Sequence, residues 1–238
     1  MVLMIFVNMS QLTNNMVARN IRMAYLTTNG FDGFVAAAAQ GQSVKNVYAS
    51  NQGAPLATHV GVRHLYAWGL YSYCGGQDDN GARSCSGRSF GHKFQPALAI
   101  GNDASKELEP TVNNKLSTTR VQTSDMGRLS RAGMYLLFVG TVILGVAFLV
   151  TCLVHMSALV IAGFLTFLGF ACVVSGSSIW TYVIHKAISG QPDGIQINYG
   201  NALWMAWAAT GSSLIAIPAL SAGSAVSTHG RNTEYEGY

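Results

Sequence analysis

Two cysteines are the side chains of the N-terminal half with the clearest capacity for chemistry. Cys74 and Cys85 are separated by ten residues and flanked by Gly, Ser, Asn and Asp. In an oxidising compartment such a pair forms a disulfide, whereas in the cytosol the two residues remain free thiols. A zinc site would require a second ligand pair at short spacing, and the sequence contains none.

Three histidines, His59, His64 and His92, lie in the same half of the chain. An unperturbed histidine titrates near neutral pH, so the three side chains could serve a pH sensor, although scattered histidines are more often ordinary surface residues. The sequence shows no paired carboxylates, no nucleophile beside a base, no phosphate loop and no metal-ligand set. We therefore expect no enzymatic activity, no catalytic residue, no cofactor and no metal.

Three apolar segments dominate the rest of the chain: residues 132–154, 156–184 and 201–224. Each reaches the length of about 20 residues that a helix needs to cross the hydrocarbon core, and none contains Lys, Arg, Asp or Glu. Lipid offers no partner to backbone N–H and C=O groups, so such segments must be helical. The sequence predicts three complete transmembrane helices, with a tight turn at residues 154–156.

The charges lie ahead of this membrane anchor. Of the 24 Lys, Arg, Asp and Glu residues, 19 precede Ala132, while 50% of the whole chain is hydrophobic. The net charge of +4 includes no dense basic run, so nucleic-acid binding is not indicated. The chain is thus a polar N-terminal half attached to a membrane-embedded C-terminal half.

The aromatic segment 63–74 (RHLYAWGLYSYC) is the most structured part of the polar half. Its composition is typical of a β-strand. Strand alternation would place three large side chains on one face: Tyr66, Trp68 and Leu70. The run 75–81 (GGQDDNG) favours a turn, after which Cys85 returns to the level of Cys74. These features predict one β-hairpin.

The remaining polar segments are predicted to be connections. Residues 102–131 are rich in charged and amide side chains and are expected to form an exposed link into the first span. Residues 189–200 (SGQPDGIQINYG) are expected to form a short turn between the second and third spans.

Small residues recur at a spacing of four in the second and third spans. The pairs are Ala158–Ala162, Ala171–Ser175, Ala202–Ala206 and Ala208–Ser212. This spacing lets helices approach closely. A polar pore lined by Ser175, Ser177 and Ser178 is the alternative, although spans without charged residues do not indicate a proton or substrate path.

The side of the membrane on which the polar half lies is contested. Basic residues near the spans favour the cytoplasm: Lys115, Arg120, Arg128, Arg131 and Lys186. The positive-inside rule weakens for connections longer than about 60 residues, and a disulfide would require the outside. The residues alone leave both orientations open.

The order of the short motifs resembles that of a known family. The motif residues are Trp68, Gly69, Leu70, Tyr71, Ser72, Cys74 and Cys85. They resemble the Trp-(Gly)-Leu-aromatic-Cys-Cys signature of claudin-like four-span proteins. They are more similar still to the fungal Sur/PalI family of plasma-membrane proteins, which is linked to cortical patches called eisosomes. In that family a stretch similar to residues 20–31 (NIRMAYLTTNGF) precedes the motif, and three spans follow it.

The resemblance implies an all-α membrane bundle with a small extracellular region, whose β-hairpin is pinned by a Cys74–Cys85 disulfide. Trp68 would pack against the hairpin and the membrane surface. The family's first span would end near residues 10–18, where this chain is apolar only in MVLMIF, so the start is expected to be the remnant of a first membrane helix. The expected segments are that remnant and its exit (1–18), an extracellular loop region (19–131), transmembrane helices (132–154, 156–184, 201–224), an extracellular turn (185–200) and a cytoplasmic tail (225–238).

The resemblance also implies a location and a role. The protein is expected to be a multi-pass plasma-membrane scaffold that organises membrane domains, with links to cell-wall integrity and endocytosis. Its expected partners are membrane lipids, further copies of itself or other membrane proteins, with no nucleic acid and no small-molecule substrate. Two alternatives are an ambient-pH-sensing signalling subunit of the PalI type and a claudin-like adhesion or pore-forming protein.

Overall fold

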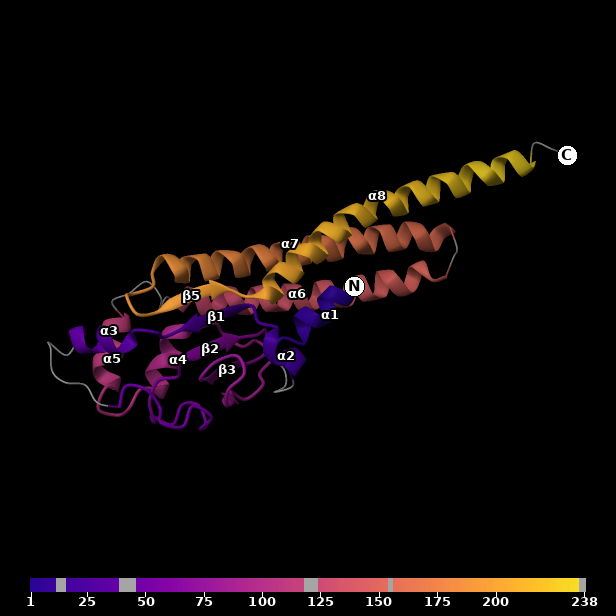
Figure 1. Ribbon diagram of the computed structural model, residues 1–238. Coiled ribbons are helices and arrows are strands. Elements are labelled where there is room, and N and C mark those ends of the chain that lie inside the picture. Colours follow the sequence, from indigo (N-terminus) through magenta and orange to yellow (C-terminus); the bar gives the residue numbers. More distant parts are fainter. Residues whose placement is uncertain (12–15, 39–45, 118–123, 154–155, 236–238) are drawn as a thin grey trace.

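Three long helices lie side by side, and a small β-sheet domain is attached near one end of them (Figure 1). The computed structural model of the protein describes residues 1–11, 16–38, 46–117, 124–153 and 156–235, and all statements below concern these residues. Residues 154–155 of the predicted tight turn lie outside the described residues.

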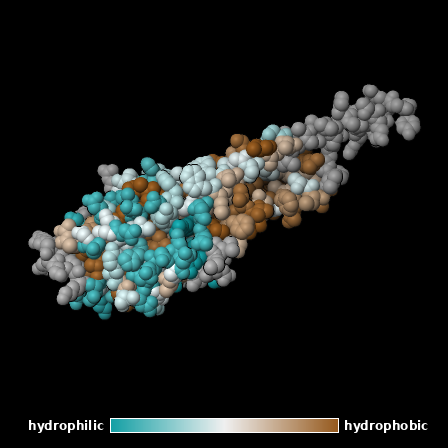
Figure 2. Space-filling view, viewed as in Figure 1, coloured by the Kyte–Doolittle hydropathy of each residue, from teal (hydrophilic) through white to brown (hydrophobic). Residues whose placement is uncertain are grey.

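The three predicted apolar segments are helical. They form α6 (Ser124–Thr151), α7 (Met156–Ser189) and α8 (Asn201–Tyr235). Within the described residues, each helix is long and apolar enough to cross a membrane. Large apolar side chains cover the outside of this part of the molecule, as the brown surface in Figure 2 shows. At 1.5 Å per residue α7 is about 51 Å long, well beyond the ~30 Å hydrocarbon core. One of its ends contacts β5 of the polar domain.

The contact between α6 and α7 is built on glycine. Gly133 and Gly140 of α6 face Gly176 and Gly169 of α7, respectively, in antiparallel order. A Cβ added at Gly176 would lie 3.0 Å from the carbonyl oxygen of Gly133, and one at Gly140 would lie 3.3 Å from that of Gly169. The two backbones therefore approach as closely as small residues permit.

The polar half folds around a five-stranded antiparallel sheet, in the order β4-β3-β2-β1-β5. The strands are β1 (Ala24–Thr27), β2 (Leu65–Trp68), β3 (Tyr73–Gly76), β4 (Arg83–Cys85) and β5 (Gln196–Tyr199). β1 pairs with β2 and β5, so Ala24 lies opposite both Trp68 and Tyr199. The fifth strand comes from the chain between α7 and α8.

The prediction of one hairpin in segment 63–85 is wrong, because this segment contains three strands, β2, β3 and β4. Segment 63–74 is not one strand, because the chain turns between β2 and β3, where the Gly69 amide donates to the Ser72 carbonyl at 2.9 Å. Segment 189–200 is more than a turn, since it contains β5. The sheet therefore joins parts of the chain on both sides of the first two long helices.

Residues 102–117 and 124–131, the described part of the predicted exposed connection, are largely folded into helices. Helix α4 (Pro96–Asp103) ends and α5 (Glu109–Ser117) lies within this part of the chain. Asp103 is fully buried and lies 3.8 Å from the equally buried guanidinium of Arg63. Burial raises the pKa of the Asp103 carboxyl, although the pairing with Arg63 opposes that rise.

Three short helices complete the polar half and the bundle. They are α1 (Val2–Asn8), α2 (Met16–Asn20) and α3 (Phe31–Ala38). α1 packs against α8 and also touches α6, so it occupies a fourth position in the bundle (Figure 1). Met4 and Val7 are the fully buried side chains of α1.

Replacement of Gly176 by valine should destabilise the bundle. Its Cβ would lie 2.8 Å from Cγ of Leu137 as well as close to Gly133, and such overpacking costs about 1–3 kcal/mol. We expect the purified protein in detergent to have a lower melting temperature, which is measured by tryptophan fluorescence. Gly163→Val is the matched control, because nothing lies within 4 Å of a Cβ at Gly163. Equal losses in both variants would contradict the glycine contact.

Candidate functional site

The Cys74–Cys85 disulfide closes the hairpin of β3 and β4. The two cysteines are directly opposite each other in the strand register, with their Cα atoms 3.9 Å apart. The disulfide implied by the resemblance is thus present in the structure. Closing a loop of this size stabilises the fold by about 2–3 kcal/mol in the chain-entropy estimate.

Trp68 connects the sheet to the helices from inside the protein. Its ring is 1% exposed, stacks near Tyr73 at 5.9 Å and meets Phe94 edge-on at 5.2 Å. Phe94 in turn packs against Trp180 of α7 at 6.0 Å. Trp68 therefore contacts the hairpin as expected, and it reaches the bundle through Phe94.

The next motif residues hold the chain that leaves α1. A Cβ at Gly69 would lie 2.3 Å from the carbonyl oxygen of Ser10, so only glycine allows this crossing. The Leu70 amide donates to the Ser10 hydroxyl at 3.2 Å, and the Ser72 hydroxyl donates to the Gln11 carbonyl. Nothing in the local sequence marks Ser10 and Gln11 as partners of the motif, and sequence reasoning missed them.

Tyr71 extends this contact to α6. Its hydroxyl donates to the Asn8 side-chain oxygen at 2.7 Å. The Asn8 amide nitrogen donates to the Thr141 hydroxyl at 2.8 Å, as well as to the Met4 carbonyl at 2.8 Å. The motif, the end of α1 and the middle of α6 are therefore joined by one chain of hydrogen bonds.

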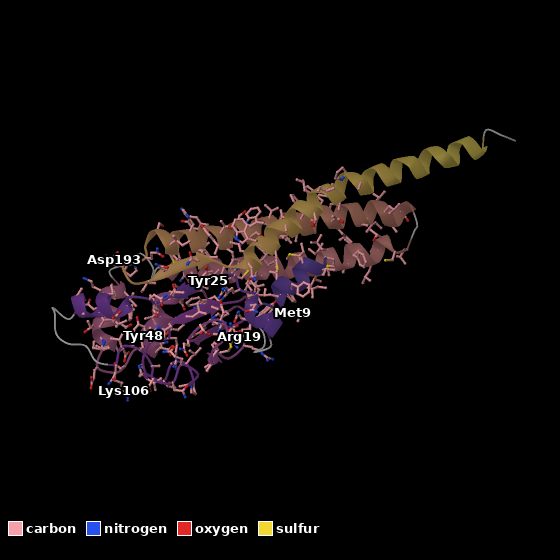
Figure 3. All side chains as sticks on the ribbon, viewed as in Figure 1. Met9, Arg19, Tyr25, Tyr48, Lys106 and Asp193 are labelled. Atoms are coloured by element: carbon pink, nitrogen blue, oxygen red, sulfur yellow. A yellow bond between two sulfur atoms is a disulfide. The ribbon has the colours of Figure 1, made fainter. Side chains whose placement is uncertain are left out.

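The chain between α2 and β1 contacts the hairpin of β3 and β4 through an ionic interaction. Asp79, in the turn between β3 and β4, accepts hydrogen bonds from Arg22 at 2.7 Å and Arg83 at 2.6 Å. Partial burial would raise the pKa of Asp79, but these two guanidinium groups outweigh it and hold the pKa below its usual value. Arg19, labelled in Figure 3, donates to the Gly81 carbonyl in the same turn.

The three histidines do not converge on one site. Each has a different neighbour: Nδ1 of His59 lies 3.5 Å from Glu109, His64 stacks on Tyr48 at 4.2 Å, and His92 stacks on Tyr73 at 5.5 Å. Burial lowers the pKa of His92.

The small-residue pairs divide into two kinds. Ala158–Ala162 and Ala202–Ala206 are buried inside the bundle, whereas Ala171–Ser175 and Ala208–Ser212 are exposed. Ser212 lines a cavity between α6, α7 and α8, so only Ala171–Ser175 lies wholly on the outer face. Sequence reasoning missed the glycines of α6 and α7, whose spacing of seven was the available signal.

The serines of the alternative pore point in different directions. Ser177 is fully buried, whereas Ser175 and Ser178 are exposed. The Ser175 hydroxyl donates to the Ala171 carbonyl of its own helix at 2.8 Å. The three side chains do not line one path.

These features define the class of protein: a multi-pass membrane protein whose apolar helix bundle carries a disulfide-bonded antiparallel sheet near one end. The chain belongs to the SUR7/PalI family, because the model of that family matches residues 1–217. The matched region contains α1, the motif, all five strands and most of the apolar bundle. No curated protein and no solved structure gives a significant match.

Replacement of Gly69 by alanine should displace the exit of α1. The added methyl group would overlap the Ser10 carbonyl, at a cost of about 1–3 kcal/mol. We expect faster hydrogen exchange of the amides of residues 2–11 in the purified protein. Gly87→Ala, where a Cβ meets nothing within 4 Å, is the control on the same side of the molecule. Unchanged exchange in Gly69→Ala would show that the motif does not hold α1.

Proposed function

We propose that this protein is a structural scaffold of the plasma membrane, which associates with itself and with lipids to organise membrane domains of the eisosome type. The proposal includes links to cell-wall integrity and endocytosis, which the resemblance to the family implies. The observation that carries the proposal is the outward-facing pair Ala171–Ser175 on α7. The proposal includes no catalytic step.

The exposed small residues are suited to contact with another helix. Neighbouring outward positions of α7 carry large side chains, such as Phe164 and Phe167 at 67% and 57% exposure, whereas the side chains of Ala171 and Ser175 are small. The Ser175 hydroxyl already has its acceptor within α7. A second helix can therefore approach without leaving a polar group unsatisfied in lipid.

The sheet domain is proposed to face the cell exterior. A disulfide at Cys74 and Cys85 persists in an oxidising compartment and is rare in the cytosol. This supports the outside more strongly than the basic residues near the spans support the inside, because the segment ahead of α6 is long enough for the charge rule to weaken.

Leucine at both positions 171 and 175 should weaken self-association. The larger side chains prevent close approach of the two backbones. We expect the dimer-to-monomer ratio in nanodiscs to fall about tenfold, which corresponds to roughly 1.4 kcal/mol. Single-molecule photobleaching of fluorescently tagged protein measures this ratio. The control variant is Phe164→Leu with Phe167→Leu, which changes bulky outward positions of the same helix. A monomeric wild-type protein, spread evenly in cells, would overturn the scaffold proposal.

Thiol labelling should report the orientation. A membrane-impermeant maleimide is expected to label Cys74 and Cys85 on intact cells only after an impermeant reductant has opened the disulfide. The double variant Cys74→Ser with Cys85→Ser should lose this label. Labelling that appears only after permeabilisation would place the domain in the cytoplasm.

A further inference from the structure

We propose that a pocket between the sheet domain and α6 binds the anionic headgroup of a phospholipid from the membrane leaflet on the domain's side. The pocket has a volume of about 330 Å³. Six of its lining residues carry the argument: Trp68, Tyr73, Lys93, Gln95, Asn102 and Arg131. The inference requires that α6 lies in a membrane and that the leaflet on the domain's side contains an anionic phospholipid, and it does not depend on the scaffold role.

The charge of the pocket is complementary to a phosphate group. Lys93 and Arg131 contribute two cations, and no carboxylate is among the lining residues. Nε of Arg131 donates to the Gly91 carbonyl at 3.1 Å, which fixes the side chain. Its two terminal nitrogens have no hydrogen-bond partner among the described residues and remain for a phosphate oxygen, with which a guanidinium forms paired hydrogen bonds.

The other walls suit a headgroup that carries hydroxyl groups. Tyr73 stacks between Trp68 and His92, at 5.9 and 5.5 Å, and forms an aromatic wall. Gln95 and Asn102, at the two ends of α4, contribute amides that donate and accept hydrogen bonds. A phosphate-linked polyol matches this combination better than a choline group, whose cation would meet Lys93 and Arg131.

The pocket lies at the height of the membrane boundary. Arg131 directly precedes the apolar part of α6. A Cβ at Gly133, two residues further on, would lie 2.9 Å from the ring of Trp180 on α7. Tyr182, two residues after Trp180 on α7, is 55% exposed. Trp204, near the start of α8, is 64% exposed. Exposed aromatic residues of this kind mark the level at which lipid headgroups lie.

An exposed aromatic surface leads from the pocket towards the hydrocarbon core. Gly91 lines the pocket, and a Cβ there would lie 2.8 Å from the hydroxyl of Tyr135. Phe90, 56% exposed, packs against Tyr135 at 5.3 Å and Phe138 at 5.1 Å. Phe138 is also exposed on α6. A lipid with its phosphate at Arg131 can therefore place its acyl chains along Phe90 and Phe138.

The test measures lipid retained by the full-length protein. The protein is incorporated into vesicles of phosphatidylcholine with phosphatidylinositol, extracted in mild detergent and analysed by native mass spectrometry. The wild type should retain phosphatidylinositol in preference to phosphatidylcholine. Lys93→Gln with Arg131→Gln should lower this retention about tenfold, because charge-assisted hydrogen bonds are lost. Ser89→Trp, which fills the pocket and keeps both cations, should lower it similarly.

The controls separate the pocket from general surface charge and from a soluble-anion site. Arg88→Gln with Arg128→Gln removes two exposed cations of the same loop and helix that do not line the pocket, and should retain lipid as the wild type does. An equal fall in this control, or undiminished retention in Ser89→Trp, would overturn the proposal. Full displacement of the lipid by millimolar inorganic phosphate would also overturn it. An intact disulfide and an unchanged melting temperature establish that each variant is folded.

Discussion

The close approach of α6 and α7 is the contact on which the rest of the structure depends. In lipid, helices gain little hydrophobic free energy by pairing, so backbone contact at Gly133–Gly176 and Gly140–Gly169 supplies packing that larger residues would prevent. The ends of the same helices that lie near the sheet contact the domain (Figure 1). Ser130 of α6 accepts the Phe94 amide at 2.9 Å, and Trp180 of α7 meets the Phe94 ring. The spacing of the two helices thus sets the position of the sheet.

The motif at residues 68–85 makes structural contacts on two sides. Its tryptophan faces the domain core, whereas its glycine, serine and first tyrosine face the end of α1. The disulfide joins β3 to β4 directly after the turn between β2 and β3. The same turn is hydrogen-bonded to Ser10 and Gln11. This arrangement explains why residues of such different chemistry occur within one short segment.

The sequence was sufficient for those features that depend on local composition. Uninterrupted apolar runs predicted the three helices, and the order of the motif predicted the family and the disulfide. Strands β1 and β5 were missed because each is four residues long and pairs with segments far away in the sequence: β1 with β2 and β5, and β5 with β1. Asp103 was assigned to an exposed link because its partner, Arg63, lies 40 residues away. Contacts between distant segments leave no periodic signal in either one.

The position of β5 has a consequence for biogenesis. Strands β1 to β4 precede α6, but β5 is made only after α7. The free edge of β1 therefore stays unpaired during synthesis until both helices have entered the membrane and residues 196–199 return to the same side. Completion of the sheet can thus report that α6 and α7 have been inserted as a pair.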